Sequence, residues 1–484
     1  MQNNIDIKSF ESFKTTTTLD ISSMLEKQSL QSYSQIGGST SAPEKKSSNP
    51  SPEKGGHSCV VKNIVCNTDT MSSDLDAESD ENKRSKIVKG SLADHYEWNI
   101  IESLIKTIDK EWKTDYLLYP DQACNLKIDQ LETTSLSKDI KECIAEFGTE
   151  DLELLNMIIN YGGSSLLKYR NESQNNSNAC CKFIHIYLQI FTGLALLKSK
   201  TNNIAHRDIK NQNVVISEAI DEETGKTYTK AKIIDFDLAT NINRRKSFLD
   251  WYSDTQFKYV YWPTDLILTD GKNGIREDMT KIFNQIRNKI DKALIDDKFE
   301  AYKIAIIESW KLITDPNICN INNTSFWSND NDIQDQLLQT SAQFIIDLHI
   351  HKKFETPELN ADLCLAIQQN WDVYMMGILL AQEYKITIDS KKTPFFAGNV
   401  EKELKDKLLA KFTFQNDLKQ LILKMISLHP INRISLESAI TEYINIIKKL
   451  QFDLAEIDNF SDNIQGIKKE DLIKIIEREC YIDI

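Results

Sequence analysis

Glycine is scarce in this chain, with 15 glycines among 484 residues. This is about half of the usual share of roughly 7%, and it excludes collagen-like and glycine-linker architectures. The nine cysteines contain no C-x-x-C pair, so the sequence has neither a zinc-ligand spacing nor the disulfide framework of a secreted protein. We therefore expect scattered reduced thiols in an intracellular compartment.

A long apolar run is also absent. The longest, residues 183–197, contains His185 and Gln189 and is too short and too polar to cross a bilayer. Residues 1–10 contain no apolar signal core. These two absences predict a protein with no membrane span and a cytoplasmic location.

Positive charge is in deficit: 58 Lys and Arg face 72 Asp and Glu, for a net charge of −14. This argues against a general nucleic-acid binder that relies on bulk positive charge, although local basic patches are not excluded. The hydrophobic share of 40% and the charged share of 27% are ordinary for a soluble globular chain. The length allows two or three domains, or one large two-lobed domain.

Apolar spacing predicts strands early in the chain and helices later. Residues 1–30 are polar and predict a loose leader, and residues 69–89 and 270–369 are interpreted as inserts. We expect strands at 59–65, 152–161, 214–216 and 232–234, and helices at 97–105, 183–197 and across 371–447. This order predicts an α+β fold with a small sheet-rich lobe and a large helical lobe.

The most informative segment is 206–213, His-Arg-Asp-Ile-Lys-Asn-Gln-Asn, which is followed by an apolar strand. A second strand ends in Ile-Ile-Asp-Phe-Asp at 233–237. Phosphoryl transfer needs a carboxylate at the attacking hydroxyl, a cation at the γ-phosphate, and oxygen ligands for Mg²⁺. The residues that offer these groups are Asp208, Lys210, Asn213 and Asp235.

The pattern H-R-D-x-K-x-x-N followed by D-F-x resembles the catalytic and metal-binding loops of eukaryotic-type protein kinases. Lys210, two residues after Asp208, resembles the Ser/Thr-specific branch. The resemblance implies a two-lobed kinase-like fold: a small ATP-binding lobe at 31–163, a large catalytic lobe at 164–450 that carries the helical insert 270–369, and a helical tail at 451–484. It also implies ATP and Mg²⁺ as cofactors and a protein that carries Ser or Thr hydroxyls as substrate.

Two later segments resemble further kinase motifs. Residues 371–379, Trp-Asp-Val-Tyr-Met-Met-Gly-Ile-Leu, resemble the central helix of the large lobe, in which the acid at Asp372 holds the catalytic-loop backbone. Residues 429–435 resemble a late turn whose arginine, Arg433, pairs with the acid that ends the activation segment. That acid is expected to be Asp265.

The small lobe matches less well. A glycine loop is expected at Ile36, Gly37 and Gly38, where two glycines of the family pattern are missing. The resemblance implies that Lys62 holds the α- and β-phosphates and pairs with Glu97. Lys89 is the alternative to Lys62, and the alternatives to Glu97 are Glu81 and Glu102.

The segment 157–163 resembles the hinge, where the backbone at Asn160 and Tyr161 meets the adenine ring. Asp237 replaces the glycine of the D-F-G motif; similar D-F-D sequences occur in some kinases of large DNA viruses, which would place the protein in host cytoplasm or a virion. Candidate phosphorylation sites in the activation segment are Ser247, Ser253 and Thr255, and Asp254 offers fixed charge instead.

The resemblance therefore implies a Ser/Thr protein kinase that uses MgATP, with no nucleic-acid partner expected and no prediction of oligomeric state. Two alternatives stay open. The first is a pseudokinase that acts as a protein-binding scaffold, favoured by Asp237 and by the missing glycines. The second is a small-molecule kinase of the aminoglycoside type, which shares the Asp, Asn and Asp arrangement but not the H-R-D-x-K sequence.

Overall fold

The computed structural model divides the chain into two units, Met1–Ser51 and Pro52–Ile484. The residues that the structure describes all belong to the second unit. They are 53–54, 58–62, 82–93, 95–108, 110–126, 153–173, 179–200, 203–220, 227–242, 263, parts of 285–308, 337–345, 365–383, 414–456, 463–464 and 467–468.

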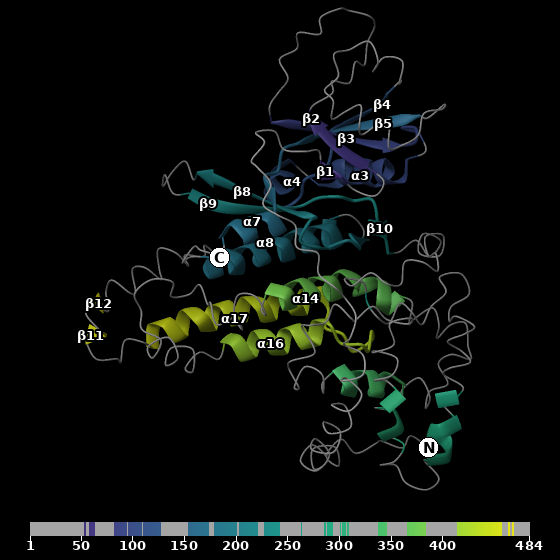
Figure 1. Ribbon diagram of the computed structural model, residues 1–484, viewed down its shortest axis with the longest axis vertical. Helices are drawn as coiled ribbons and strands as arrows, with labels where there is room; N and C mark the ends of the chain where they lie inside the picture. The colour runs from purple at the N-terminus through teal and green to yellow at the C-terminus, as the bar shows by residue number, and fades with distance from the viewer. Residues whose placement is uncertain are drawn as a thin grey trace, which may run out of the picture. The chain divides into compact units, whose positions relative to one another are not determined.

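A five-stranded antiparallel sheet begins this unit (Figure 1). Its spatial order is β1-β2-β3-β5-β4, so β3 lies in the middle. The strands are β1 Glu53–Lys54, β2 Ser58–Lys62, β3 Lys83–Lys89, β4 Gln122–Leu126 and β5 Leu154–Asn160. Two helices lie between β3 and β4 in the chain, α3 Tyr96–Thr107 and α4 Lys110–Tyr116. The apolar face of α3 is buried through Trp98, Ile101 and Leu104, which explains the spacing seen in the sequence.

The position of β3 corrects the interpretation of residues 69–89 as an insert. Lys83–Lys89 pairs with β5 along its whole length, from Lys83 opposite Asn160 to Lys89 opposite Leu154. Four consecutive residues of this strand, Ser85 to Val88, are buried. The sequence KRSKIVK looks solvated because four of its seven residues are basic, but burial of one lysine is tolerated where carboxylates surround it.

A second antiparallel sheet, in the order β6-β8-β9, follows. Its strands are β6 Ser164–Ser165, β8 Val214–Ile220 and β9 Thr227–Ile233. The hairpin pairs from Val214 opposite Ile233 to Ile220 opposite Thr227, so both strands are longer than the sequence predicts. Strands β7 Ile204–Ala205 and β10 Thr240–Asn241 pair with each other as a small antiparallel sheet.

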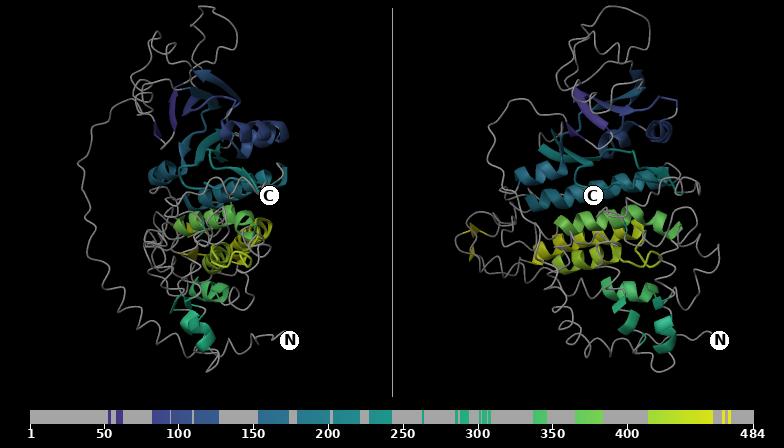
Figure 2. Two further views of the ribbon diagram at one scale, coloured as in Figure 1. Left: turned by 90° about the vertical axis from the view of Figure 1, so that its right-hand side faces the viewer. Right: turned by 45° about the vertical axis from the view of Figure 1, so that its right-hand side comes forward.

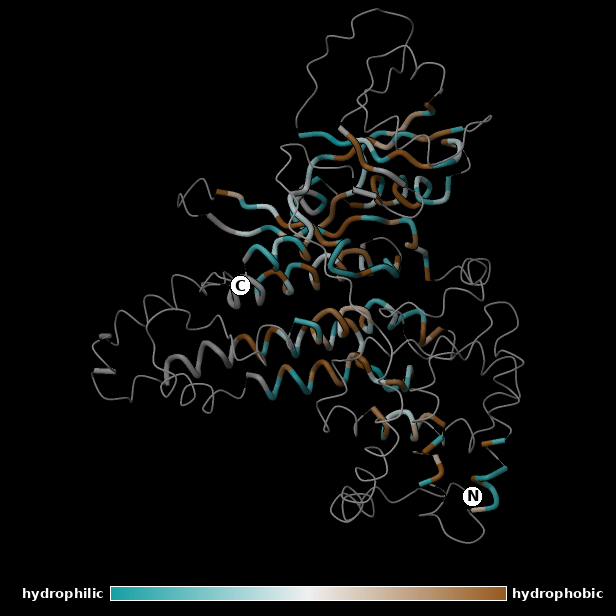
Figure 3. Tube along the Cα trace, in the orientation of Figure 1, coloured by the Kyte–Doolittle hydropathy of each residue, from teal (hydrophilic) through white to brown (hydrophobic). Residues whose placement is uncertain are grey.

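Helices make up most of the rest of the described chain. They are α7 Leu166–Ser173, α8 Ala179–Lys200, α14 Trp371–Glu383, α16 Phe414–Met425 and α17 Leu436–Glu456. The last three lie side by side in both views of Figure 2. Hydrophobic and hydrophilic residues alternate along the coils of α16 and α17 in Figure 3, as expected for helices with one buried face. A short hairpin, β11 Asn463–Ile464 and β12 Ile467–Lys468, comes last.

The predicted α+β class is confirmed, with antiparallel sheets and helices. Cys124 of β4 is disulfide-bonded, which differs from the expectation of reduced thiols. Within the described residues, no helix combines the length and apolar character needed to cross a membrane.

Candidate active site

The segment 206–213 forms a loop between β7 and β8, and its polar side chains converge on one carboxylate. Asp208 is buried, with 6% of its surface exposed. Its Oδ2 atom accepts a hydrogen bond of 2.7 Å from Lys210 Nζ and one of 2.7 Å from Asn213 Nδ2. Asn213 Nδ2 also donates to the Asp208 carbonyl at 3.0 Å. The loop thus fixes the orientation of the Asp208 carboxylate with two donors from within six residues of sequence.

Asp372, at the start of α14, binds the backbone of this loop through its carboxylate. Its two carboxylate oxygens accept hydrogen bonds from the backbone N–H groups of His206 and Arg207, both at 2.7 Å. Arg207 has a φ of 64°, a conformation that non-glycine residues adopt at a cost, and its guanidinium lies 4.8 Å from the Trp371 ring centroid. Burial raises the pKa of Asp372, although the two backbone N–H donors and the charge of Arg207 favour the charged form.

His206 and Phe236 join the loop to the segment that follows β9. The His206 Nε2–H donates to the Ile234 carbonyl at 3.0 Å, while Nδ1 accepts from the Asp208 N–H at 3.2 Å, so the ring is the neutral tautomer with its proton on Nε2. Its centroid lies 5.0 Å from that of Phe236, which is fully buried. The Ile234 N–H also donates to the Asn213 carbonyl at 3.0 Å.

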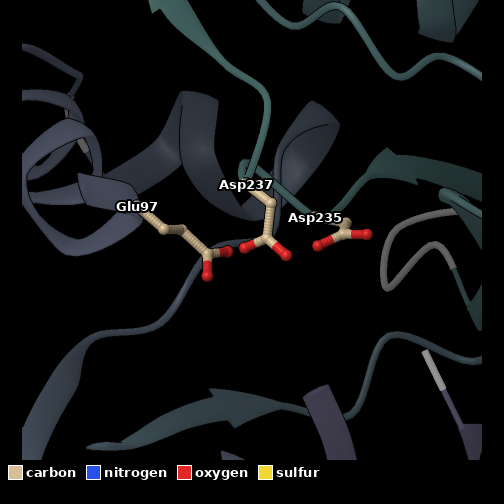
Figure 4. Close-up of side chains that lie close together, drawn as sticks. All are labelled: Glu97, Asp235 and Asp237. Atoms are coloured by element: carbon tan, nitrogen blue, oxygen red, sulfur yellow. The ribbon is translucent and has the colours of Figure 1, made fainter. Parts of the chain in front are cut away.

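Asp235 follows directly and begins a second polar group. Its φ is 69°, another left-handed non-glycine conformation. Asp235 Oδ1, Glu97 Oε1 and Asp237 Oδ1 surround Lys86 Nζ at 2.7, 2.7 and 3.0 Å. Figure 4 shows the three carboxylates in a row, Glu97 from α3 and the two aspartates from the segment after β9. We call Lys86 with these three acids the lysine cluster.

Within the lysine cluster, burial and neighbouring charges shift the pKa values of Lys86, Glu97 and Asp237. Burial alone would lower the pKa of Lys86, but Glu97, Asp235 and Asp237 outweigh it and raise that pKa well above its usual value. Burial, with the charges of the neighbouring aspartates, raises the pKa of Glu97 against the attraction of Lys86. Burial would also raise the pKa of Asp237, yet Lys86 and a hydrogen bond with Glu97 hold it far below its usual value. Lys86 is therefore a fixed cation.

Lys86 is a candidate site residue that the sequence interpretation missed. The structure brings Lys86 to Glu97. Lys62 ends β2 opposite Arg84, and its side chain lies outside the described residues. The alternative Lys89 ends β3 and is exposed, and Glu102 instead accepts from the Trp98 indole and lies near Lys106. A signal was present: Lys86 is the one lysine of 83–89 followed by two β-branched residues in the pattern K-I-V.

The hinge prediction falls on β5 and the turn after it. Asn160 is the exposed last residue of β5, and Tyr161 is 54% exposed with the Arg84 guanidinium 4.5 Å from its ring. The predicted glycine loop at Ile36, Gly37 and Gly38 lies outside the described residues, as do Glu81, Asp265 and the candidate phosphorylation sites Ser247, Ser253 and Thr255. Arg433 donates to the Ser427 carbonyl through Nε at 3.1 Å and Nη2 at 2.9 Å.

One comparison with known proteins found a match for this chain. Residues 105–279 match the family model described as the protein kinase domain. The match supports a protein kinase and a kinase-like fold, and such a domain implies protein substrates. No curated protein matches the chain. The matched range contains the Asp208 loop and Asp235 but neither Lys86 nor Glu97, so the lysine cluster extends the site beyond the part of the sequence that the family model recognises.

Proposed function

We propose that this protein is a Ser/Thr protein kinase that transfers the γ-phosphate of MgATP to protein hydroxyls. The observation that carries the proposal is the contact between Lys86 Nζ and Asp235 at 2.7 Å, which joins residues 149 positions apart in the sequence. Asp235 in turn follows Ile234, whose N–H donates a hydrogen bond to the carbonyl of Asn213 in the catalytic loop. The nucleotide-positioning lysine and the catalytic loop thus meet at one place.

The donor set suits the implied cofactors. Asn213 uses its Nδ2 atom toward Asp208, which leaves its amide oxygen as the atom that could bind a cation, and Asp235 offers a carboxylate. These are the hard oxygen ligands that Mg²⁺ prefers. Lys86, held by Glu97, would position the α- and β-phosphates, and the backbone at Asn160 and Tyr161 would meet the adenine ring. When bound, Mg²⁺ neutralises phosphate charge.

In this proposal the chain's own residues position the acceptor. The Asp208 carboxylate orients the substrate hydroxyl and accepts its proton, while Lys210 places a positive charge 2.7 Å from that carboxylate, near the transferred phosphoryl group. The preference for Ser and Thr rests on Lys210. In the proposed domain organisation, 1–30 is a leader, 31–163 the small lobe, 164–450 the large lobe with the insert 270–369, and 451–484 a tail.

The first prediction tests catalysis directly. Asp208→Asn removes the proton acceptor, and we expect transfer of ³²P from ATP to a Ser/Thr acceptor protein or to the protein itself to fall by about 10²–10⁴-fold. The matched control is Asp115→Asn, which also removes an aspartate paired with a lysine, Lys230 at 2.8 Å. Equal transfer by wild type and Asp208→Asn would reject catalysis at this site.

A pseudokinase is the second candidate, and the contact between Asp237 and Lys86 favours it. A carboxylate at 3.0 Å from the phosphate-binding lysine competes with the nucleotide for the same ammonium group. Thermal stabilisation by ATP without transfer to any acceptor, including a tyrosine-containing one, would favour this scaffold role over catalysis.

A further inference from the structure

The three N–H donors of the Lys86 ammonium are matched by three carboxylates in this structure. Glu97, Asp235 and Asp237 each contribute one oxygen within 3.0 Å of Nζ. A phosphate that binds Lys86 must therefore displace at least one carboxylate, because the ammonium has no fourth proton to donate. Glu97 comes from α3, whereas Asp235 and Asp237 both come from the segment after β9.

The lysine cluster carries more negative than positive charge. Three carboxylates face one ammonium group, and one ligand oxygen from each of the three acids lies within 4.8 Å of the others. Such an arrangement leaves an excess of negative charge that attracts a second cation and repels phosphate.

A separate observation points to a missing ligand. Glu97 is 3% exposed, and its buried Oε2 atom has no N–H or O–H donor in the described part of the chain, so its hydrogen bond with Asp237 requires a proton that the two acids share. In Figure 4 its carboxyl group is directed toward that of Asp237. A buried carboxylate oxygen without a donor costs free energy, and a proton or a metal ion between these acids would remove that cost.

We propose that Asp237 is a divalent-cation ligand beside Asp235, and that it makes nucleotide binding at Lys86 depend on that cation. With the cation bound, both aspartates release Lys86, and the ammonium becomes available to phosphate. Without it, Asp237 keeps its contact with Lys86 and excludes the nucleotide. The inference rests on the proposed function only for its nucleotide part; the cation site stands on the lysine cluster alone.

Cation binding is tested first and without nucleotide, by titrating Mn²⁺ into the full chain and following the electron paramagnetic resonance signal of free Mn²⁺. Loss of an outer-shell partner typically weakens metal binding 10–100-fold, so loss of a direct ligand in Asp237→Asn should weaken it by at least about tenfold. Asp237→Glu keeps a carboxylate and should bind Mn²⁺ more tightly than Asp237→Asn. Asp115→Asn, which changes a pair with Lys230 and no member of the lysine cluster, should match wild type.

Nucleotide linkage is tested next, by measuring ADP affinity in saturating Mg²⁺ and in EDTA. For wild type the ratio of the two dissociation constants should be large. For Asp237→Asn it should shrink by about tenfold or more, because metal-free ADP no longer competes with Asp237. Far-UV circular dichroism of each variant confirms folding, and Asp237→Glu provides the comparison if Asp237→Asn does not fold.

The outcomes separate the two ideas. If wild type and Asp237→Asn bind Mn²⁺ equally and show the same ADP ratio, the role of Asp237 is overturned while the kinase proposal stands. If wild type does not bind ADP even in Mg²⁺, the proposed function and the nucleotide linkage both fail, and the Mn²⁺ titration alone decides the cation site.

Discussion

Replacing Asp372 by alanine should destabilise the protein strongly, because this one carboxylate holds the catalytic loop. It accepts two backbone N–H bonds of 2.7 Å, from His206 and Arg207, and it is 9% exposed. Each buried N–H left without an acceptor costs about 1–3 kcal/mol, so the two together should lower the free energy of unfolding by roughly 2–6 kcal/mol. Total stabilities of about 5–15 kcal/mol are usual, so the loss is a large fraction.

The backbone of Arg207 adds to this expectation. Its φ of 64° is retained only while its surroundings hold it, and Asp372 is the acceptor of its N–H. Once the carboxylate is removed, the loop is free to leave the strained conformation, and Asp208 would lose its position. We therefore expect loss of phosphate transfer to accompany the loss of stability.

Urea denaturation followed by circular dichroism measures the effect. Asp372→Asn keeps one carbonyl oxygen and should cost about half as much, roughly 1–3 kcal/mol. The control Asp115→Asn breaks a partly exposed pair with Lys230 and should cost less than about 1 kcal/mol. If Asp372→Ala were no more destabilising than Asp115→Asn, the two hydrogen bonds would not be what holds the loop.

Two further substitutions test other parts of the site. Lys86→Ala leaves Glu97 buried without its cation; we expect about 3–5 kcal/mol of lost stability in urea denaturation and weaker ADP binding, and an unchanged ADP affinity would remove Lys86 from the nucleotide site. Gly163 has a φ of 103°, and a Cβ there would lie 2.0 Å from the Ile216 carbonyl oxygen. Gly163→Ala should therefore lower the melting temperature more than Gly90→Ala, where the nearest atom is 3.2 Å away on a side chain, and equal losses would contradict this close approach.

The catalytic loop could be predicted because its contacts are local. Asp208, Lys210 and Asn213 lie within six residues, and the hydrogen bonds among them follow from that spacing. The helices α3 and α8 were also predictable. The residue pattern shows one apolar face for α3 and apolar residues on all sides for α8. The strands β8 and β9 were predicted too short, because the polar residues 218–229 were interpreted as an insert between them, although 218–220 pair with 227–229.

The order of the five-stranded sheet could not be read from the chain. Strand β3 contains four basic residues, Lys83, Arg84, Lys86 and Lys89, and the K-I-V pattern that begins at Lys86 marks the buried one without showing which way its side chain faces. A sheet sets its faces by register, and a shift of one residue exchanges them. Only the pairing of β3 with β2 and β5 places Lys86 inside and leaves Lys89 exposed.

The sequence by itself determined the chemical groups and their local order: an acid, a lysine and an amide in one loop, and a second acid after the next strand. The tertiary structure decided which lysine completes the site, because Lys86 meets Asp235 across 149 residues and Glu97 from a separate helix. It also showed that Asp237 contacts the same ammonium group. Contacts among neighbours in the chain follow from spacing, whereas contacts between distant segments depend on how strands pair and helices pack.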